Sequence, residues 1–109
     1  MKTVRLLASE KRDMLETIVV NADCGYVYSL IVGGPFSVAN YWQVDGVPPA
    51  FMSVGTGKGR DIVCRYFDSQ NEFDARNTVS MRDGLEGLEE FLRVPSQCPN
   101  IERLQWEEV

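Results

Sequence analysis

Four stretches of the chain have the hydrophobic pattern of a β-strand. The stretch GYVYSLIVG at 25–33 is apolar on both alternating faces, which is typical of a central strand covered on both sides. FSVANYWQV at 36–44 has the pattern of a half-buried strand. One of its faces consists of Phe36, Val38, Trp42 and Val44. AFMSV at 50–54 and RDIVCRYFD at 60–68 follow after short connections, so we expect three consecutive antiparallel strands.

A helical period of apolar residues appears near the N-terminus. Ser9 is a suitable cap for the segment EKRDMLETIVV, which places Met14, Leu15 and Ile18 on one helical face. The β-branched run at 17–20 favours a strand instead. We predict a helix that ends near residue 19.

The strongest helical pattern follows a polar segment, DSQNEFDARNT at 68–78, which we predict to be a loop. Ser80 and Asp83 have the spacing of a capping box, with Asp in place of the usual Glu. The apolar positions that recur at helical spacing are Met81, Leu85, Leu88, Phe91 and Leu92. Gly84 and Gly87 each cost about 1 kcal/mol relative to alanine inside a helix. Either this helix lies close against the sheet or it is weakly held.

The chain closes on IERLQWEEV, which places Leu104 and Trp106 on one face of an extended segment. This pattern predicts a strand at a sheet edge, with the indole of Trp106 as a core anchor. The predicted fold is therefore α+β: a single antiparallel sheet with an N-terminal helix, a helix from the C-terminal half packed on it, and a closing strand. We expect one domain spanning residues 1–109.

Composition agrees with a folded, water-exposed protein. The chain is 44% hydrophobic and 25% charged, which argues against disorder. It contains no apolar run near the roughly 20 residues that a membrane span needs, so we expect a cytoplasmic protein without membrane contact. Cys24, Cys64 and Cys98 are widely spaced without a CxxC pair, which predicts reduced thiols in buried positions.

The net charge of −5 is unevenly distributed. Residues 68–109 hold ten acidic residues against four arginines, a net charge of −6, whereas residues 1–67 carry +1. Such an acidic half repels phosphate backbones and attracts basic proteins. We therefore expect no direct nucleic-acid ligand, although a protein that itself binds nucleic acid is a suitable partner.

The residues required for common small-enzyme chemistry are absent. Without a histidine the chain has no His-based triad and no His-based zinc or iron site. GTGKG at 55–59 lacks both the Walker spacing and the Ser or Thr after its lysine. Carboxylate pairs such as Asp68 with Glu72 leave open an enzyme that uses clustered acids and a metal. We expect no catalysis, no cofactor and no metal.

Two segments have a familiar order of elements. YWQVDGVPPAFMSVGTGKGRDIVCRYFD combines a hairpin, a Gly-rich turn and a strand, and MRDGLEGLEEFLRVPSQCPNIERLQWEEV combines a helix ending in EEFL, a proline-containing loop and a terminal strand with a Trp-Glu pair. From about residue 40 onward this order resembles the immunity proteins of bacterial polymorphic toxin systems, particularly the family often encoded beside nucleic-acid deaminase toxins.

The resemblance implies an α+β protein without catalysis that binds a cognate toxin and blocks its active site or substrate surface. It implies that Trp106 belongs to the fold and that the partner is a basic protein. The expected partner-binding residues are Asp68, Glu72, Phe73, Asp74, Glu86, Glu90 and Glu107. The alternative is a small acidic binding module with another partner. The oligomeric state is not predicted.

Overall fold

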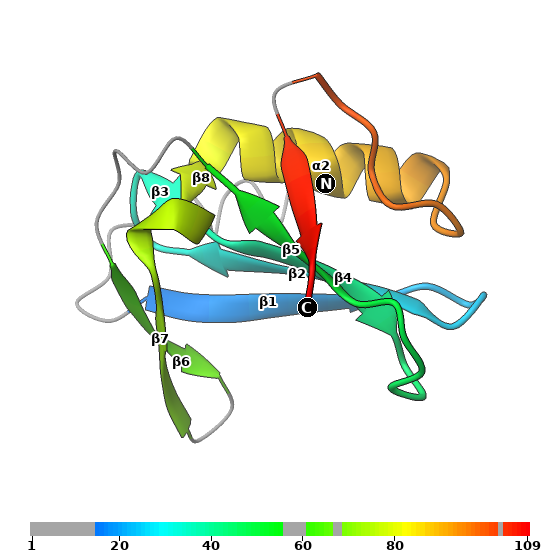
Figure 1. Ribbon diagram of the computed structural model, residues 1–109, viewed down its shortest axis with the longest axis horizontal. Helices are drawn as coiled ribbons and strands as arrows, with labels where there is room; N and C mark the ends of the chain where they lie inside the picture. Colours follow the sequence, from blue (N-terminus) through cyan, green and yellow to red (C-terminus); the bar gives the residue numbers. More distant parts are fainter. Residues whose placement is uncertain (1–14, 56–60, 67–68, 103) are drawn as a thin grey trace.

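The computed structural model describes residues 15–55, 61–66, 69–102 and 104–109. The main element is a seven-stranded sheet with the strand order β7-β6-β1-β2-β4-β5-β9. The sheet is curled, and α2 covers one of its two faces (Figure 1). The sheet strands are β1 (Leu15–Asn21), β2 (Tyr26–Val32), β4 (Ala39–Gln43), β5 (Phe51–Val54), β6 (Ile62–Tyr66), β7 (Ser69–Phe73) and β9 (Gln105–Glu108). The remaining elements are β3 (Phe36–Ser37) paired with β8 (Val79–Ser80), the 3-10 helix η1 (Ala75–Asn77) and α2 (Met81–Arg93).

The sheet is mixed, so the prediction of a single antiparallel sheet is wrong. β1 pairs in parallel with β6, with Leu15 opposite Cys64, whereas its other neighbour β2 is antiparallel. The prediction of three consecutive antiparallel strands is correct only for its first two strands, β4 and β5, and the third, β6, does not pair with β5. β5 pairs with β4 on one side and with the closing strand β9 on the other, and this leaves β6 to join the far side of the sheet.

The predicted N-terminal helix is wrong where the structure describes it. Residues 15–19 belong to β1, which pairs with β2 over six positions from Glu16 to Asn21. The β-branched run at 17–20 suits a pleated strand, and the pairing with β2 supplies the hydrogen bonds that a helix would otherwise make internally. The earlier part of that prediction, 9–14, lies outside the described residues. Among the described residues α2 is the only α-helix.

The predicted polar loop at 68–78 contains a strand. β7 pairs with β6 along its whole length, from Ser69 opposite Tyr66 to Phe73 opposite Ile62. As the outermost strand it tolerates polar residues, because one of its faces meets solvent. Gln70 and Glu72 are exposed, whereas Asn71 and Phe73 are partly buried. The period of two was present in this stretch, but polar side chains obscured it.

β2 is the central strand that the sequence predicts, since it lies between β1 and β4 and is buried on both faces. On β4, however, the face that the helix covers is the one with Ala39 and Tyr41, whereas Phe36 and Val44 are 41% and 66% exposed. The stretch 36–44 is not one continuous strand. It breaks between β3 and β4, where the Ser37 hydroxyl donates to the Ile31 carbonyl at 2.7 Å.

The helix α2 lies close against the sheet. Its predicted start is confirmed, because the Ser80 side chain accepts a hydrogen bond from the Asp83 N–H at 3.1 Å. The Tyr28 hydroxyl donates to the Gly84 carbonyl at 2.8 Å. A Cβ atom at Gly87 would lie 2.5 Å from both the Tyr28 hydroxyl and a Leu104 methyl. The two glycines therefore permit close packing rather than weakening a free helix. No helix within the described ranges is long and apolar enough to cross a membrane.

The closing strand β9 pairs antiparallel with β5, with Trp106 opposite Ser53. The indole N–H of Trp106 donates to the Pro99 carbonyl at 2.9 Å, and its ring meets that of Tyr28 edge-on at 6.2 Å. Trp106 packs against the main core cluster, as predicted for a core anchor. The predicted buried thiols are found at Cys64 and, partly, at Cys98, whereas Cys24 is exposed.

Alkaline pH is expected to destabilise the fold. Burial raises the pKa of the Tyr28 hydroxyl above its usual 10.0, and it raises the pKa of the Cys98 thiol from 9.0 to about 12. The unfolded chain therefore loses these protons first, so the free energy of unfolding is retained below about pH 9 and falls as the pH rises further. Urea unfolding at about pH 7.5 and about pH 10.5 measures this, and Tyr28→Phe should reduce the dependence. Equal stability at both pH values would contradict the prediction.

Candidate binding groove

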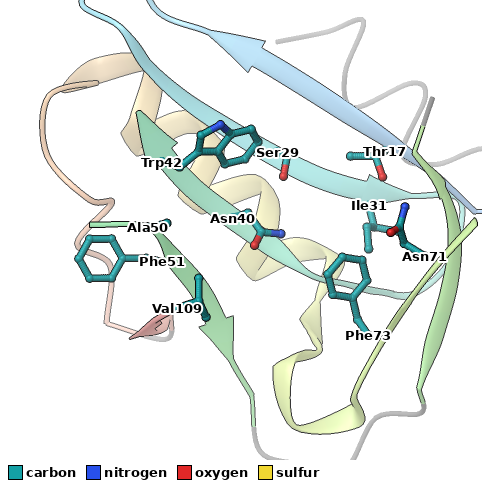
Figure 2. Close-up of a pocket in the computed structure, with 10 residues that line it drawn as sticks. All are labelled: Thr17, Ser29, Ile31, Asn40, Trp42, Ala50, Phe51, Asn71, Phe73 and Val109. Atoms are coloured by element: carbon teal, nitrogen blue, oxygen red, sulfur yellow. The ribbon is translucent and has the colours of Figure 1, made fainter. Parts of the chain in front are cut away.

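The concave face of the curled sheet forms a groove with a volume of about 310 Å³ (Figure 2). Alternation along β2 explains how this face is built: Tyr28 and Leu30 pack in the core cluster with α2, whereas Ser29 and Ile31 point into the groove. The full lining consists of Thr17, Ser29, Ile31, Asn40, Trp42, Ala50, Phe51, Asn71, Phe73 and Val109. Strands far apart in the sequence, β1, β2, β4, β5 and β7, therefore contribute to one surface.

A set of contacts through η1 ties the β7 edge to the β5 and β9 edge. The Gly55 N–H donates to the Arg76 carbonyl at 2.7 Å, and the Ser53 hydroxyl donates to the Asn77 carbonyl at 2.8 Å. The Asn77 side-chain amide donates to the Ser53 carbonyl at 3.0 Å and to Glu107 Oε1 at 2.8 Å. Arg76 forms an ion pair with the same Glu107 carboxylate. We call these contacts the clasp, and they fix the separation of the two edges beside the groove.

The groove has an aromatic and amide character. Trp42 and Phe73 lie toward its opposite ends, with Asn40 between them, and Phe51 lies along one side (Figure 2). None of the ten lining residues has an ionisable side chain. The lining therefore supplies apolar surface and uncharged hydrogen-bonding groups, but no general acid, base or charged nucleophile. Its chemistry suits binding.

The predicted site residues from the 68–74 segment lie beside this groove. Phe73 is one of its lining residues, and Glu72 and Asp74 are exposed on either side of Phe73 in the chain. The structure therefore places Phe73 in the groove and Glu72 on the opposite face of β7, with Asp74 directly after the strand. Asp68 lies outside the described residues.

The other predicted site residues are held in pairs within the chain. On α2, Glu86 accepts from Arg82 Nε at 3.2 Å, and Glu90 accepts from Arg93 Nε at 3.1 Å. Because α2 covers the opposite face of the sheet, these two glutamates do not share the groove surface (Figure 1). Glu107 lies on β9 and belongs to the clasp, and its side chain is 30% exposed.

Sequence patterns alone did not identify most of the groove. Phe73 was predicted as a contact residue, whereas Trp42, Asn40 and Asn71 were not. A usable signal was present in the alternation of β2 and β4, because residues flanking Tyr28, Leu30 and Tyr41 must point away from the helix. The contribution of β7 and of Val109 depends on the curl of the sheet, which local periodicity does not encode.

Glu107→Ala is expected to lower the free energy of unfolding by about 1 kcal/mol, because it removes an ion pair and an amide hydrogen bond from the clasp. Glu108→Ala is the matched control, since Glu108 is the exposed neighbour on the same strand. Urea unfolding of both variants measures the difference. Equal stability of the two would show that the Glu107 contacts do not hold the sheet edges.

Within the described residues, no three His, Cys, Asp or Glu side chains gather in a way that could hold a metal ion.

All three arginines with described side chains form ion pairs with glutamates of the same chain, namely Arg76, Arg82 and Arg93. Among the residues with described side chains, the exposed acids next to groove residues in the chain are Glu72, Asp74 and Glu108. No protein-family model matches this sequence, and no curated protein matches it either.

Proposed function

We propose that this chain is a non-catalytic binding protein that neutralises a basic toxin produced by the same cell. The toxin acts on nucleic acid, for example as a deaminase, and the chain blocks its active site or its substrate surface. The observation that carries this proposal is the β7 edge: Phe73 lines an uncharged aromatic groove, and Glu72 and Asp74, its neighbours in the chain, are exposed carboxylates on the same edge.

This surface combines the two features that a fast and lasting protein contact needs. Exposed acids raise the encounter rate with a basic surface, and an enzyme that acts on nucleic acid usually presents such a surface to its substrate. Lasting affinity comes from a few desolvated apolar contacts. Trp42, Phe51 and Phe73 supply such contacts in the groove, and the exposed acids of the β7 edge supply the attraction.

The lining of the groove supports binding rather than catalysis. Reactions of small hydrolases and transferases need a proton donor or acceptor near the bound substrate. The groove lining consists of hydroxyl, amide, aliphatic and aromatic side chains. These groups recognise a surface, but they do not exchange protons with it at neutral pH.

The resemblance of the two quoted segments to immunity proteins supplies the class of partner. These segments cover 41–68 and 81–109, and they contain four groove residues, Trp42, Ala50, Phe51 and Val109. A toxin immunity protein must also bind tightly without acting on its partner, which agrees with the chemistry of the groove.

Capture of the partner tests this function. The tagged chain is incubated at low salt with its native lysate, and separately with the products of the neighbouring reading frames. We expect one basic protein to be retained, to be released only by high salt or denaturant, and to be toxic when expressed alone. Retention of a harmless partner would instead indicate an acidic binding module of another kind. Harmless neighbouring products that the chain does not bind would contradict the proposal.

A further inference from the structure

We propose that the groove receives an extended segment of the partner protein, with a large apolar side chain between Trp42 and Phe73 and a basic residue beside it near Asp74. This inference rests on the proposed function in one respect, namely that the partner is a protein. The segment lies on the concave face beside β7, between the two sheet edges that the clasp joins.

The lining of the groove favours an apolar side chain as its occupant. The groove volume of about 310 Å³ leaves room for a large side chain. Six of the ten lining residues are apolar: Ile31, Trp42, Ala50, Phe51, Phe73 and Val109. An aromatic or large aliphatic side chain gains most from such a surface, because it removes apolar area from water on both partners.

The polar groups of the groove match a peptide backbone. Asn40 and Asn71 each carry a side-chain amide that both donates and accepts hydrogen bonds, and Thr17 and Ser29 add hydroxyls. Each residue of an extended segment likewise presents one N–H and one C=O. Uncharged groups of this kind are suited to a neutral backbone, whereas a charged ligand would lie in the groove without a counter-charge.

The position of β7 favours an extended segment. Among the strands that the structure describes, β7 is the last of the sheet and pairs with β6 alone. Its Asn71 and Phe73 side chains line the groove. A partner segment that runs along β7 reaches these side chains and the outer edge of the strand together, as in other cases of strand addition to a sheet edge.

One acidic residue next to the groove determines which end of the segment is basic. Asp74 is exposed directly after the groove residue Phe73. Glu72 alternates with Asn71 and Phe73 along β7, and Glu108 shares the strand face of Trp106, so both side chains point away from the groove. A lysine or arginine beside the central apolar residue, at the end near Asp74, satisfies this arrangement.

A titration with a synthetic peptide tests the inference without the toxin. The probe is the blocked pentapeptide acetyl-Lys-Thr-Phe-Thr-Lys-amide, added to the nitrogen-15-labelled chain and followed by two-dimensional NMR. We expect shifts of the Trp42 indole N–H and the side-chain amides of Asn40 and Asn71. The Trp106 indole N–H, which is bonded to Pro99 in the core, is the internal reference and should not move. Replacing Phe by Ala or Lys by Glu in the peptide should weaken binding at least about tenfold.

Two variants on the same strand provide the matched comparison. Asn71→Trp fills the groove and should abolish the shift of the Trp42 indole. Gln70→Trp places the same side chain at the neighbouring exposed position and should leave binding unchanged. Shifts spread evenly over the acidic surface, or binding that survives Asn71→Trp, would overturn the inference.

The two proposals can fail separately. If a toxin is captured and Asn71→Trp binds it as tightly as the unaltered chain does, the groove inference is wrong and the function stands. If the peptide binds in the groove but the captured partner is harmless, the groove inference stands and the toxin function is wrong. Tight binding of a small molecule in place of the peptide would contradict the assigned occupant.

Discussion

Phe91→Ala is expected to lower the free energy of unfolding by about 3–5 kcal/mol, the range typical of removing a buried aromatic side chain. Phe91 is fully buried at 0% exposure. Its ring meets those of Tyr28 at 5.6 Å and Tyr41 at 6.0 Å, so the helix and the two central strands share one aromatic cluster. The loss combines the transfer of the ring into water with the cavity that remains between α2 and the sheet.

Leu92→Ala provides the control for that measurement. Leu92 is the next residue on α2 and is 48% exposed, so its truncation should cost less than about 1 kcal/mol. Urea unfolding followed by circular dichroism gives both values under the same conditions. If the two variants lose similar stability, the assignment of the buried face of α2 is wrong.

Phe91→Ala is also expected to weaken binding of the partner. Tyr28 and Tyr41, which pack against Phe91, alternate along their strands with the groove residues Ser29, Asn40 and Trp42. The cluster beneath the sheet therefore positions the opposite face. A variant weakened at Phe91 should bind the partner less tightly even though no groove side chain has been changed.

Reversing the charges at Glu72 and Asp74 is expected to have the largest effect on association with the proposed basic partner. The double variant Glu72→Lys and Asp74→Lys should slow association by about 10- to 100-fold at low salt, because the acids that attract the partner would now repel it. It should also flatten the dependence of the association rate on ionic strength. Stopped-flow or surface-based kinetics over a range of salt concentrations measures both effects.

The double variant Glu86→Lys and Glu90→Lys changes the net charge by the same amount on α2. These glutamates lie on α2, which covers the face of the sheet opposite the groove. Their ion pairs within the helix contribute only a few tenths of a kcal/mol each. The association rate of this double variant should remain within about threefold of that of the unaltered chain, since only the overall charge has changed. If the α2 variant associates more slowly than the β7 variant, the contact surface lies on the helix.

The elements that could be predicted from the sequence have local signals. Ser80 caps α2 through a bond to the nearby Asp83 N–H, and the apolar period of the helix follows at once. β2 is apolar on both faces because it is buried on both. The closing strand β9 is marked by the alternation of Leu104 and Trp106. In each case neighbouring residues in the chain determine the conformation.

The incorrect predictions depend on contacts between distant residues. Residues 15–19 carry helical and strand signals together, and pairing with β2 decides in favour of the strand. The parallel contact of Leu15 with Cys64 joins segments that no local pattern connects. β7 has the composition of a loop, and it is a strand because β6 provides a partner along its whole length.

The groove was only partly predictable for the same reason. Phe73 was recognised as an isolated aromatic residue in a polar segment, and Glu72 and Asp74 as acids beside it. Their proximity to Trp42 and Val109 results from the curl of the sheet and from the clasp that holds β7 near β5 and β9. Glu107 had a clear signal as a charged residue after Trp106, but its bonds to η1 require the folded chain.

The most direct test of the proposed function is a growth assay with the captured partner. The partner is expressed in a neutral host alone, with the unaltered chain, and with each of the two charge-reversed variants. We expect that the partner alone stops growth, that the unaltered chain and the Glu86→Lys, Glu90→Lys variant restore it, and that the Glu72→Lys, Asp74→Lys variant does not. Normal growth with the partner alone, or full rescue by both variants, would contradict the proposed function.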